Sequence, residues 1–335
     1  MLQICTTDLH CGGGTVRVVR GDQLPVISGN SLLEKRNYFR DNLDYIRKFL
    51  LHEPRGHEDL YGIVVLESDD VTADVNLILL HNAGYGSMCG HGALAMGRFA
   101  VDTGIVRKPT SPETEVRLRC PCGIVRVFVQ YENGRTGSSR FISVPSFVFA
   151  RDVKASVQGY GDVTADVCYG GAFFVHVKAS LLGLDVRTSS IDDLIRAGDA
   201  VTRVFKACVT VTHPDSPDLA FIVGTNLVDD NEDNPDVPTA MVCIFADKQV
   251  ERSPCGSGSA ARIAQLYERG HLKLGETRQI QGPTGDCFKT TPIKDVKYGE
   301  HNAVIVEVEG RAYYAGKAEL ILEEGDEIGK GFLLR

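Results

Sequence analysis

The feature that most constrains the fold of this chain is an internal repeat. Residues 88–104 read MCGHGALAMGRFAVDTG, and residues 254–270 read PCGSGSAARIAQLYERG. The offset is constant at 255 − 89 = 166 residues in a chain of 335, and it aligns Cys89 with Cys255 without a gap. The other coinciding positions are Gly90/Gly256, Gly92/Gly258, Ala95/Ala261 and Gly104/Gly270. The repeat therefore predicts two related halves, a division that the chain length also favours.

Each repeat follows an apolar, strand-like segment and continues into a predicted helix. In the second repeat, the residues at i, i+3, i+4 and i+7 are Ala260, Ile263, Ala264 and Tyr267, which is the apolar stripe of a buried helix. A glycine closes each segment, as expected for a helix C-terminus. We therefore expect one cysteine at the start of one helix in each half.

Strands and two further helices are predicted around the repeats. Residues 31–51 carry apolar residues at helical spacing with Ser31 as cap, and residues 191–211 begin as a helix capped by Ser190. Alternating or continuous apolar runs predict strands over 15–19, 62–66, 75–80, 116–120, 124–131, 140–144, 162–168, 173–177, 219–223, 240–245, 303–309, 311–314 and 319–322.

Charge and composition exclude several classes of protein. The formal net charge is −8 and basic residues form no runs, which argues against a nucleic-acid or anionic-membrane partner. No apolar stretch reaches the roughly 18 residues of a membrane-spanning helix, and residues 1–10 are too short and polar for a secretory signal. We therefore expect a cytoplasmic protein that acts on a small molecule, with its ten cysteines as free thiols.

A cysteine at a helix N-terminus is chemically activated. The unpaired N–H groups and partial positive charge there favour a thiolate and can also hold a carboxylate. One such site alone fits a nucleophile, a redox thiol or a carboxylate clamp. Two equivalent sites favour a substrate held across a pseudo-twofold axis, where a thiolate and a thiol exchange the proton of one carbon from opposite faces. This chemistry requires no cofactor, and no spacing of residues indicates a metal site.

The two cysteine motifs resemble a known family. MCGHG (88–92) and RSPCGSG (252–258) resemble the active-site motifs of the proline racemase family, which includes proline racemases, 4-hydroxyproline 2-epimerases and trans-3-hydroxy-L-proline dehydratases. HEPRGHEDLYG (52–62), YGGAFF (169–174), HPDSPDLAF (213–221) and GKGFLLR (329–335) look most like the dehydratase branch. The resemblance implies an α/β (α+β) fold similar to diaminopimelate epimerase. Its two pseudo-symmetric domains, residues 1–150 with 312–335 and residues 151–311, each wrap a barrel-like sheet around a central helix, with the site in the cleft.

The resemblance also assigns the site residues. Cys89 and Cys255 become the two acid–base groups, and Gly90, His91, Gly256 and Ser257 hold the substrate carboxylate. Glu251 stands where the family usually has an Asp that binds the substrate amine. Gly14 and Thr15 replace a usual Glu-Pro in a loop that borders the cleft, so that substrate preference can differ.

The function depends on Cys255, because the dehydratase branch typically has Thr at this position and the racemases and epimerases have Cys. We weigh the thiol pair above the rest of the chain and predict a cofactor-independent racemase or 2-epimerase of proline or hydroxyproline. The alternative is a trans-3-hydroxy-L-proline dehydratase with Cys89 as base. A third hypothesis, an imino-acid binding protein without activity, does not explain two thiols. The sequence leaves the oligomeric state open, with a homodimer considered.

The remaining candidate residues are interpreted as structural. Cys120 and Cys122 resemble half of a metal site but are predicted to be strand and turn thiols. The other cysteines, interpreted as core or incidental, are Cys5, Cys11, Cys168, Cys208, Cys243 and Cys287. The acidic run at residues 229–236 is predicted to be a solvated loop. His57, His81 and His213 have no zinc-like spacing, and Phe173 and Phe174 fit a ring pocket or the core equally well.

Overall fold

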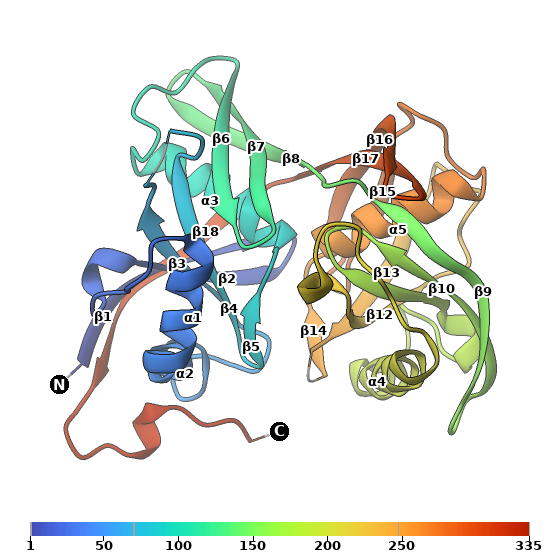
Figure 1. Cartoon of the computed structure of the whole chain (residues 1–335), viewed down its shortest axis with the longest axis horizontal. Coiled ribbons are helices and arrows are strands. Elements are labelled where there is room, and N and C mark those ends of the chain that lie inside the picture. The colour runs from blue at the N-terminus through green and yellow to red at the C-terminus, as the bar shows by residue number, and fades with distance from the viewer. Residues whose placement is uncertain (1, 70, 247, 335) are drawn as a thin grey trace. The chain divides into compact units, whose positions relative to one another are not determined.

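The computed structural model describes residues 2–69, 71–246 and 248–334, and the chain divides into two compact units (Figure 1). Unit 1 consists of Met1–Phe141 and Gly310–Arg335, and unit 2 is Ile142–Glu309. The sequence placed the corresponding breaks after residues 150 and 311. Each unit combines one mixed sheet with helices, as the predicted α+β class requires.

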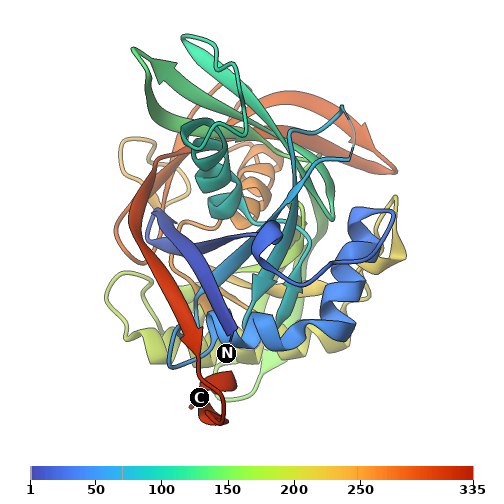
Figure 2. The same cartoon turned by 90° about the vertical axis from the view of Figure 1, so that its left-hand side faces the viewer.

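The sheet of unit 1 joins the two ends of the chain. β1 (Leu2–Cys11) pairs antiparallel with β18 (Ala312–Leu322) and with β2 (Gly14–Arg20), and Figure 2 shows β1 and β18 side by side. The sheet continues through β3 (Tyr61–Glu67), β4 (Val75–His81), β6 (Glu113–Cys120), β7 (Gly123–Glu132) and β8 (Arg135–Ile142), while β5 (Gly84–Gly86) adds to β4. The pairs β2/β3 and β4/β6 are parallel.

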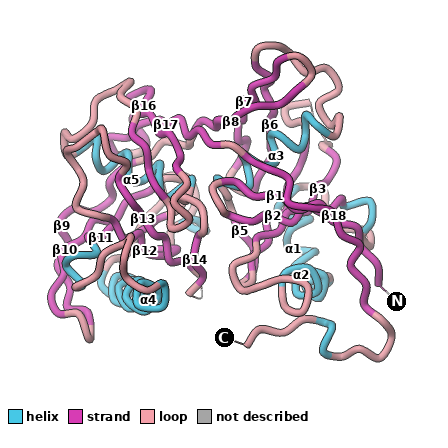
Figure 3. Tube along the Cα trace, turned by 180° about the vertical axis from the view of Figure 1, so that it is seen from behind, coloured by secondary structure: helices cyan, strands magenta, loops and turns pink. Residues whose placement is uncertain are grey.

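Helix α3 (Gly90–Asp102) is the buried helix of unit 1. It contacts β1, β2, β6, β7 and β18, so the strands surround it (Figure 3). Small residues permit this close packing: a Cβ on Gly97 would lie 2.5 Å from Val127. Successive side chains of a strand point to opposite faces of the sheet. On β3, Ile63 therefore contacts α3 on one face, while Val64 belongs to the apolar cluster under the outer helices on the other face.

The outer helices correct one prediction. The single helix expected over residues 31–51 is two helices, α1 (Leu32–Asn42) and α2 (Asp44–Leu51). They meet at Leu43, whose backbone leaves the helical region at φ −125° and ψ 14° and whose side chain is buried in the same cluster. The predicted cap is confirmed, since Ser31 Oγ accepts the Glu34 N–H at 3.2 Å.

Unit 2 repeats the plan of unit 1. Its strands follow the order β9 (Phe147–Val157), β10 (Gly161–Tyr169), β11 (Phe173–Lys178), β12 (Ile222–Val228), β13 (Thr239–Phe245), β15 (Arg278–Gln281), β16 (Cys287–Tyr298) and β17 (His301–Gly310). β14 (Gln249–Glu251) adds to β13, and the parallel pairs are β11/β12 and β13/β15. Helix α5 (Gly256–Glu268) contacts β9, β10, β11 and β16, and α4 (Ile191–Cys208) covers β12 and β13.

Two predictions for unit 2 need correction. The strand expected over residues 219–223 is a 3-10 turn, Pro217–Leu219, followed by β12, because proline favours the start of such a turn. The acidic run is not wholly solvated: Asp229 pairs with Arg187 at 2.7 Å, and Glu232 pairs with the buried Arg262 at 3.3 Å.

Short turns and the capping of α4 complete the fold. The other 3-10 turns are Gly21–Gln23, Ala179–Leu182 and Ile328–Lys330. Ser190 Oγ accepts the Asp193 N–H, which confirms the predicted cap of α4. Among the described residues, no helix has both the length and the apolar character needed to cross a bilayer.

Candidate active site

The Cys89 site comprises Cys89, Gly90, His91 and Gly92 at the start of α3. Cys89 is the N-cap with an ordinary extended backbone (φ −140°, ψ 111°), and its Sγ accepts the Gly92 N–H at 3.3 Å. A Cβ on Gly92 would lie 2.8 Å from this sulfur. Glycine is therefore required for the helix amide to reach the thiol, which is 7% exposed.

His91 borders the Cys89 thiol within the first turn of α3. Its Nδ1 and Nε2 both lie 3.6 Å from Cys89 Sγ, and its side chain is buried. The ring packs edge to face on Tyr61 of β3, with 5.5 Å between ring centroids. Sheet and helix together thus fix a histidine that can donate a hydrogen bond to the sulfur.

The turn between β6 and β7 brings two more thiols near Cys89. The Cys122 N–H donates to Ser87 O at 3.2 Å, which ties this turn to the loop before α3. The Cys120 and Cys122 thiols interact with each other. This contact, then burial and the nearby Cys122 and Cys89 sulfurs, hold the pKa of Cys120 well above its usual value, while the same contact lowers the pKa of Cys122.

The Cys255 site comprises Glu251, Ser253, Cys255, Gly256, Ser257 and Gly258 at the start of α5. Cys255 is the N-cap, and its Sγ accepts the Gly258 N–H at 3.3 Å. A Cβ on Gly258 would lie 2.9 Å from this sulfur. Ser257 Oγ lies 3.9 Å from the same atom. The Cys255 site therefore presents its thiol to the helix amides as the Cys89 site does.

The segment before Cys255 is held by a chain of hydrogen bonds. The Ser253 N–H donates to Glu251 Oε1 at 3.0 Å, and the Cys255 N–H donates to Ser253 Oγ at 3.1 Å. Cys255 itself adopts φ 58° and ψ 98°, in the left-handed region that favours glycine. Glu251 ends β14 and is 8% exposed. Its carboxylate therefore organises the backbone that presents Cys255.

A third thiol accompanies Cys255. Cys243 lies on β13, and its side chain interacts with that of Cys255. Burial is the main cause that raises the pKa of Cys243 well above its usual value, and the contact with Cys255 and the charge of Glu251 add to it. The sequence analysis interpreted this cysteine as core or incidental. Its place near Cys255 depends on the pairing of β13 with β14, which no local sequence motif indicates.

The structure thus places every predicted site residue in one of the two sites. Gly90 and His91 lie in the first turn of α3, Gly256 and Ser257 lie in the first turn of α5, and Glu251 lies next to Ser253. Ser253, Tyr61 and Cys243 were not foreseen. Phe173 belongs to the core of unit 2, and Phe174 is buried as well.

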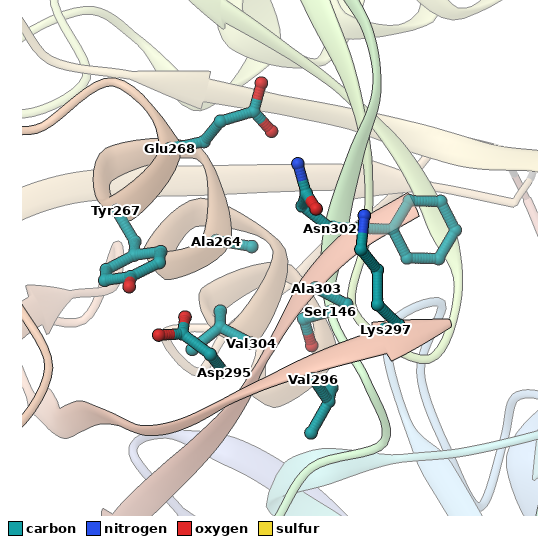
Figure 4. A pocket seen from close by; sticks show the side chains of 11 residues that line it. Ser146, Ala264, Tyr267, Glu268, Asp295, Val296, Lys297, Asn302, Ala303 and Val304 are labelled. Atoms are coloured by element: carbon teal, nitrogen blue, oxygen red, sulfur yellow. The ribbon is translucent and has the colours of Figure 1, made fainter. Parts of the chain in front are cut away.

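One cavity of unit 2 lies away from the Cys255 site. This cavity of about 580 Å³ borders the second half of α5, lined by Tyr267, Glu268, Asp295, Lys297 and Asn302 among others (Figure 4). Neither Cys255 nor Glu251 lines it. Within the described residues, no group of three or more His, Cys, Asp and Glu side chains could hold a metal ion.

The chain is similar to curated enzymes over nearly its whole length. It is 46% identical over 333 residues to a trans-L-3-hydroxyproline dehydratase from Xenopus tropicalis, covering 99% of this chain and 95% of the relative. It is also 46% identical over 336 residues to the trans-3-hydroxy-L-proline dehydratase from Homo sapiens, with the same coverage. The predicted likeness to the dehydratase branch is therefore confirmed.

Solved structures share the architecture. A hydroxyproline epimerase from Agrobacterium vitis, with bound trans-4-hydroxy-L-proline, matches with a TM-score of 0.90 and 26% identity over 100% of this chain and 95% of that chain. A probable proline racemase from Agrobacterium radiobacter matches with a TM-score of 0.89 and 27% identity over 99% and 96%. These matches confirm the predicted fold class. The family model described as proline racemase matches residues 6–333, and the chain belongs to the proline racemase family.

Proposed function

We propose that this enzyme removes water from trans-3-hydroxy-L-proline, with Cys89 as the base. The observation that carries the proposal is the 46% identity to named trans-3-hydroxyproline dehydratases over 99% of the chain. The Cys89 site supports it, because the Gly92 N–H and the start of α3 stabilise a thiolate. The comparisons thus favour the alternative of the sequence analysis over the racemase.

The proposed reaction is a balanced elimination. The Cys89 thiolate takes the proton from C2, the electron pair forms the C2–C3 double bond, and the C3–O bond breaks. The leaving hydroxyl group takes the proton that Cys89 removed from C2, so that water departs and Cys89 returns to the thiolate. The resulting cyclic enamine tautomerises to an imine, so that the product is the substrate minus one water. Only one strong base is needed for the carbon acid.

We assign the substrate contacts to the helix starts. In this proposal the first-turn residues Gly90, His91, Gly256 and Ser257 hold the carboxylate, since amides at a helix N-terminus favour an anion. Glu251 interacts with the ring nitrogen. Its carboxylate already accepts the Ser253 N–H, so its longer side chain has to serve both partners.

A second reaction is supported by Cys255. This residue is a thiol at a helix N-cap, with the same sulfur-to-amide distance of 3.3 Å as at Cys89. In 2-epimerisation or racemisation, one cysteine takes the C2 proton as thiolate and the other returns a proton as thiol. Dehydration does not require the second thiol, so Cys255 is the point at which the two reactions differ.

The experiment compares three substrates in D₂O. Trans-3-hydroxy-L-proline, trans-4-hydroxy-L-proline and L-proline are followed by NMR and chiral chromatography. We expect loss of the 3-hydroxyl group from the first substrate. Inversion at C2 with deuterium incorporation, without loss of water, would instead establish the second reaction.

Variants at Cys255 separate the two reactions further. Cys255→Thr should keep dehydration within about tenfold, because the base at Cys89 is intact. The same variant should lose epimerisation by a factor of at least about a thousand, since one of the two acid–base groups is gone. Cys208→Ser, which changes an exposed thiol of unit 2, is the matched control. If Cys255→Thr abolishes dehydration while the control is active, the single-base mechanism is wrong.

A further inference from the structure

His213 lies in the segment of unit 2 between α4 and β12, which the proposed reactions leave unused. The Asp215 and Ser216 N–H groups both donate to His213 Nδ1, each at 3.2 Å. A ring nitrogen that accepts hydrogen bonds carries no hydrogen, so in the neutral imidazole the hydrogen is on Nε2. Burial lowers the pKa of His213 below its ordinary value of 6.5, which agrees with a neutral ring at neutral pH. The turn after His213 therefore makes Nε2 the donor.

The Nε2–H group of His213 faces two tyrosines from different strands. Tyr169, the last residue of β10, places its hydroxyl oxygen 3.0 Å from Nε2, and Tyr298, the last residue of β16, places its own at 3.5 Å. The Tyr298 O–H donates to Asp215 Oδ2 at 2.5 Å, so toward His213 this oxygen is an acceptor. Because its distance is shorter, Tyr169 is the main acceptor of the His213 N–H.

Tyr169 is a buried residue with one polar group. Its side chain is 3% exposed, and its ring packs on Phe173 with 4.8 Å between ring centroids and on Phe147 with 5.2 Å. Water cannot easily replace a hydrogen-bond partner of a hydroxyl in such surroundings. The bond from His213 therefore contributes to where the end of β10 lies.

The turn that follows Tyr169, residues 170–172, lies directly on α5. A Cβ on Gly170 would be 2.2 Å from Ser257 O and 2.5 Å from the Ala261 nitrogen. The Gly170 N–H also donates to Ala172 O at 3.1 Å, so the turn is closed on itself. A displacement of Tyr169 therefore moves a turn that is packed against the backbone of Ser257, one of the residues assigned to the substrate carboxylate.

We propose that His213 is a positioning residue, which through its hydrogen bond to Tyr169 holds the 170–172 turn against Ser257 and so fixes the first turn of α5. The proposal rests on the proposed function where that function assigns the substrate carboxylate to Ser257. In this role His213 acts through Tyr169 and the backbone of Gly170, and it takes part in no proton transfer.

Two substitutions separate the two nitrogens of His213. His213→Asn places a side-chain oxygen near the position of Nδ1, so the Asp215 and Ser216 N–H groups keep an acceptor while Tyr169 loses its donor. His213→Gln reaches the position of Nε2 with its amide group, so Tyr169 keeps a donor while the turn loses its acceptor. A histidine that only stabilised its own turn would be replaced better by Asn than by Gln, and our proposal expects the reverse at α5.

The first measurement is hydrogen exchange of the backbone amides of the whole chain, without substrate, at pH 7.5. In His213→Asn and in Tyr169→Phe, residues 170–172 and 256–261 should exchange about three- to tenfold faster than in the parent. His213→Gln should stay within about twofold there and exchange faster only at residues 213–221. The matched control is His271→Asn, which changes another histidine of unit 2, paired with Asp233, and should leave residues 170–172 and 256–261 unchanged.

The second measurement is kinetic. The carboxylate is held in the bound substrate and in the transition state alike, so a looser first turn of α5 weakens both equally. His213→Asn should therefore raise KM for trans-3-hydroxy-L-proline by about three- to tenfold and leave kcat within about twofold. His213→Gln should keep both constants within about twofold of the parent.

The exchange experiment decides the role of His213. Faster exchange at residues 170–172 and 256–261 in His213→Asn, with recovery in His213→Gln, supports it. Unchanged exchange there in both His213→Asn and Tyr169→Phe overturns it, because the packing of Tyr169 on Phe173 would then suffice. A Gln variant that matches the Asn variant at α5 also overturns it. The expected exchange pattern without turnover of any imino acid by the parent would count against the proposed function and leave the role of His213 intact.

Discussion

The Cys89 and Cys255 sites have the same arrangement at the helix N-terminus, but the side chains that pack beneath the two helices differ in polarity. The sulfur-to-amide distance is 3.3 Å at both Cys89 and Cys255. The third residue of each helix is a glycine that packs against a strand side chain. Gly92 of α3 packs against Ile63, and Gly258 of α5 packs against Asn226. The strand next to each supplies Val18 opposite Ile63, and His176 opposite Asn226. An apolar layer therefore supports the Cys89 site and a polar layer supports the Cys255 site.

The difference extends into the helices. The offset of 166 residues aligns Met96 of α3 with Arg262 of α5 (262 − 96 = 166), and both side chains are fully buried. Asn226 Nδ2 lies 3.1 Å from His176 Nε2, and Arg262 pairs with Glu232. The two halves thus share the helix N-terminus and its glycines, while the packing beneath α3 is apolar and the packing beneath α5 is polar and charged.

The largest effect is expected at Cys89. Cys89→Ser should reduce turnover of trans-3-hydroxy-L-proline by at least about a thousandfold, because a hydroxyl is a far weaker acid than a thiol and supplies little anion near neutral pH. The measurement is kcat at saturating substrate, with circular dichroism to verify the fold.

The same assay tests whether the two sites are equivalent. Cys255→Ser should have a much smaller effect on dehydration than Cys89→Ser. Equal losses in both variants would contradict the unequal roles that we propose for the two cysteines.

The next effect concerns the buried charge of α5. Arg262→Met gives α5 the side chain that α3 has, but it removes one of the two cations that pair with Glu232, the other being Lys178, and the donor to the buried Gln265 side chain. We expect the free energy of unfolding in urea to fall by about 2–4 kcal/mol. Met96→Leu, a substitution that conserves volume in α3, should cost less than about 1.5 kcal/mol. An Arg262→Met variant as stable as its parent would mean that the charged layer adds nothing.

These two regions also show how far the sequence reaches. The repeat predicted both helices and both cysteine caps, because glycine and cysteine spacing is local information. The layer of His176, Asn226 and Arg262 could not be predicted, since it depends on the parallel register of β11 and β12. The contact of Cys243 with Cys255 depends likewise on the β13–β14 pairing. Long-range pairing, which no local pattern encodes, therefore determines what surrounds each thiol.

The pH dependence of stability should report the polar layer. Burial, and then the charge of Arg262, holds the pKa of His176 well below its ordinary value of 6.5. Below pH 6.5, His176 therefore binds a proton in the unfolded chain but stays neutral in the folded chain. The free energy of unfolding is therefore not reduced by His176 above pH 6.5. Below pH 6.5 it falls as the pH decreases, by up to about 1.4 kcal/mol per pH unit from this residue.

A variant isolates this contribution from that of the other histidines. His176→Gln removes the titrating ring and should reduce the pH dependence of the unfolding free energy between pH 6.5 and 5. His52 of unit 1 also has a pKa lowered mainly by burial, so His52→Gln serves as the matched comparison. If the slope is the same in His176→Gln as in the parent, His176 is not held neutral by the fold.

The smallest effect returns to the backbone of the two cysteines. Cys255 has φ 58°, whereas Cys89 has φ −140°, so only Cys255 stands where a side chain strains the backbone. Cys255→Gly relieves that strain and should raise the free energy of unfolding by about 1 kcal/mol. Cys89→Gly relieves no backbone strain and adds conformational freedom to the unfolded chain. It should therefore lower the free energy of unfolding by a similar amount. Opposite signs in thermal or urea unfolding would show that the fold tolerates a strained residue at one site alone. Because glycine would suit that position better, the retention of a side chain there is best explained by chemistry at Cys255, and equal signs would remove this argument.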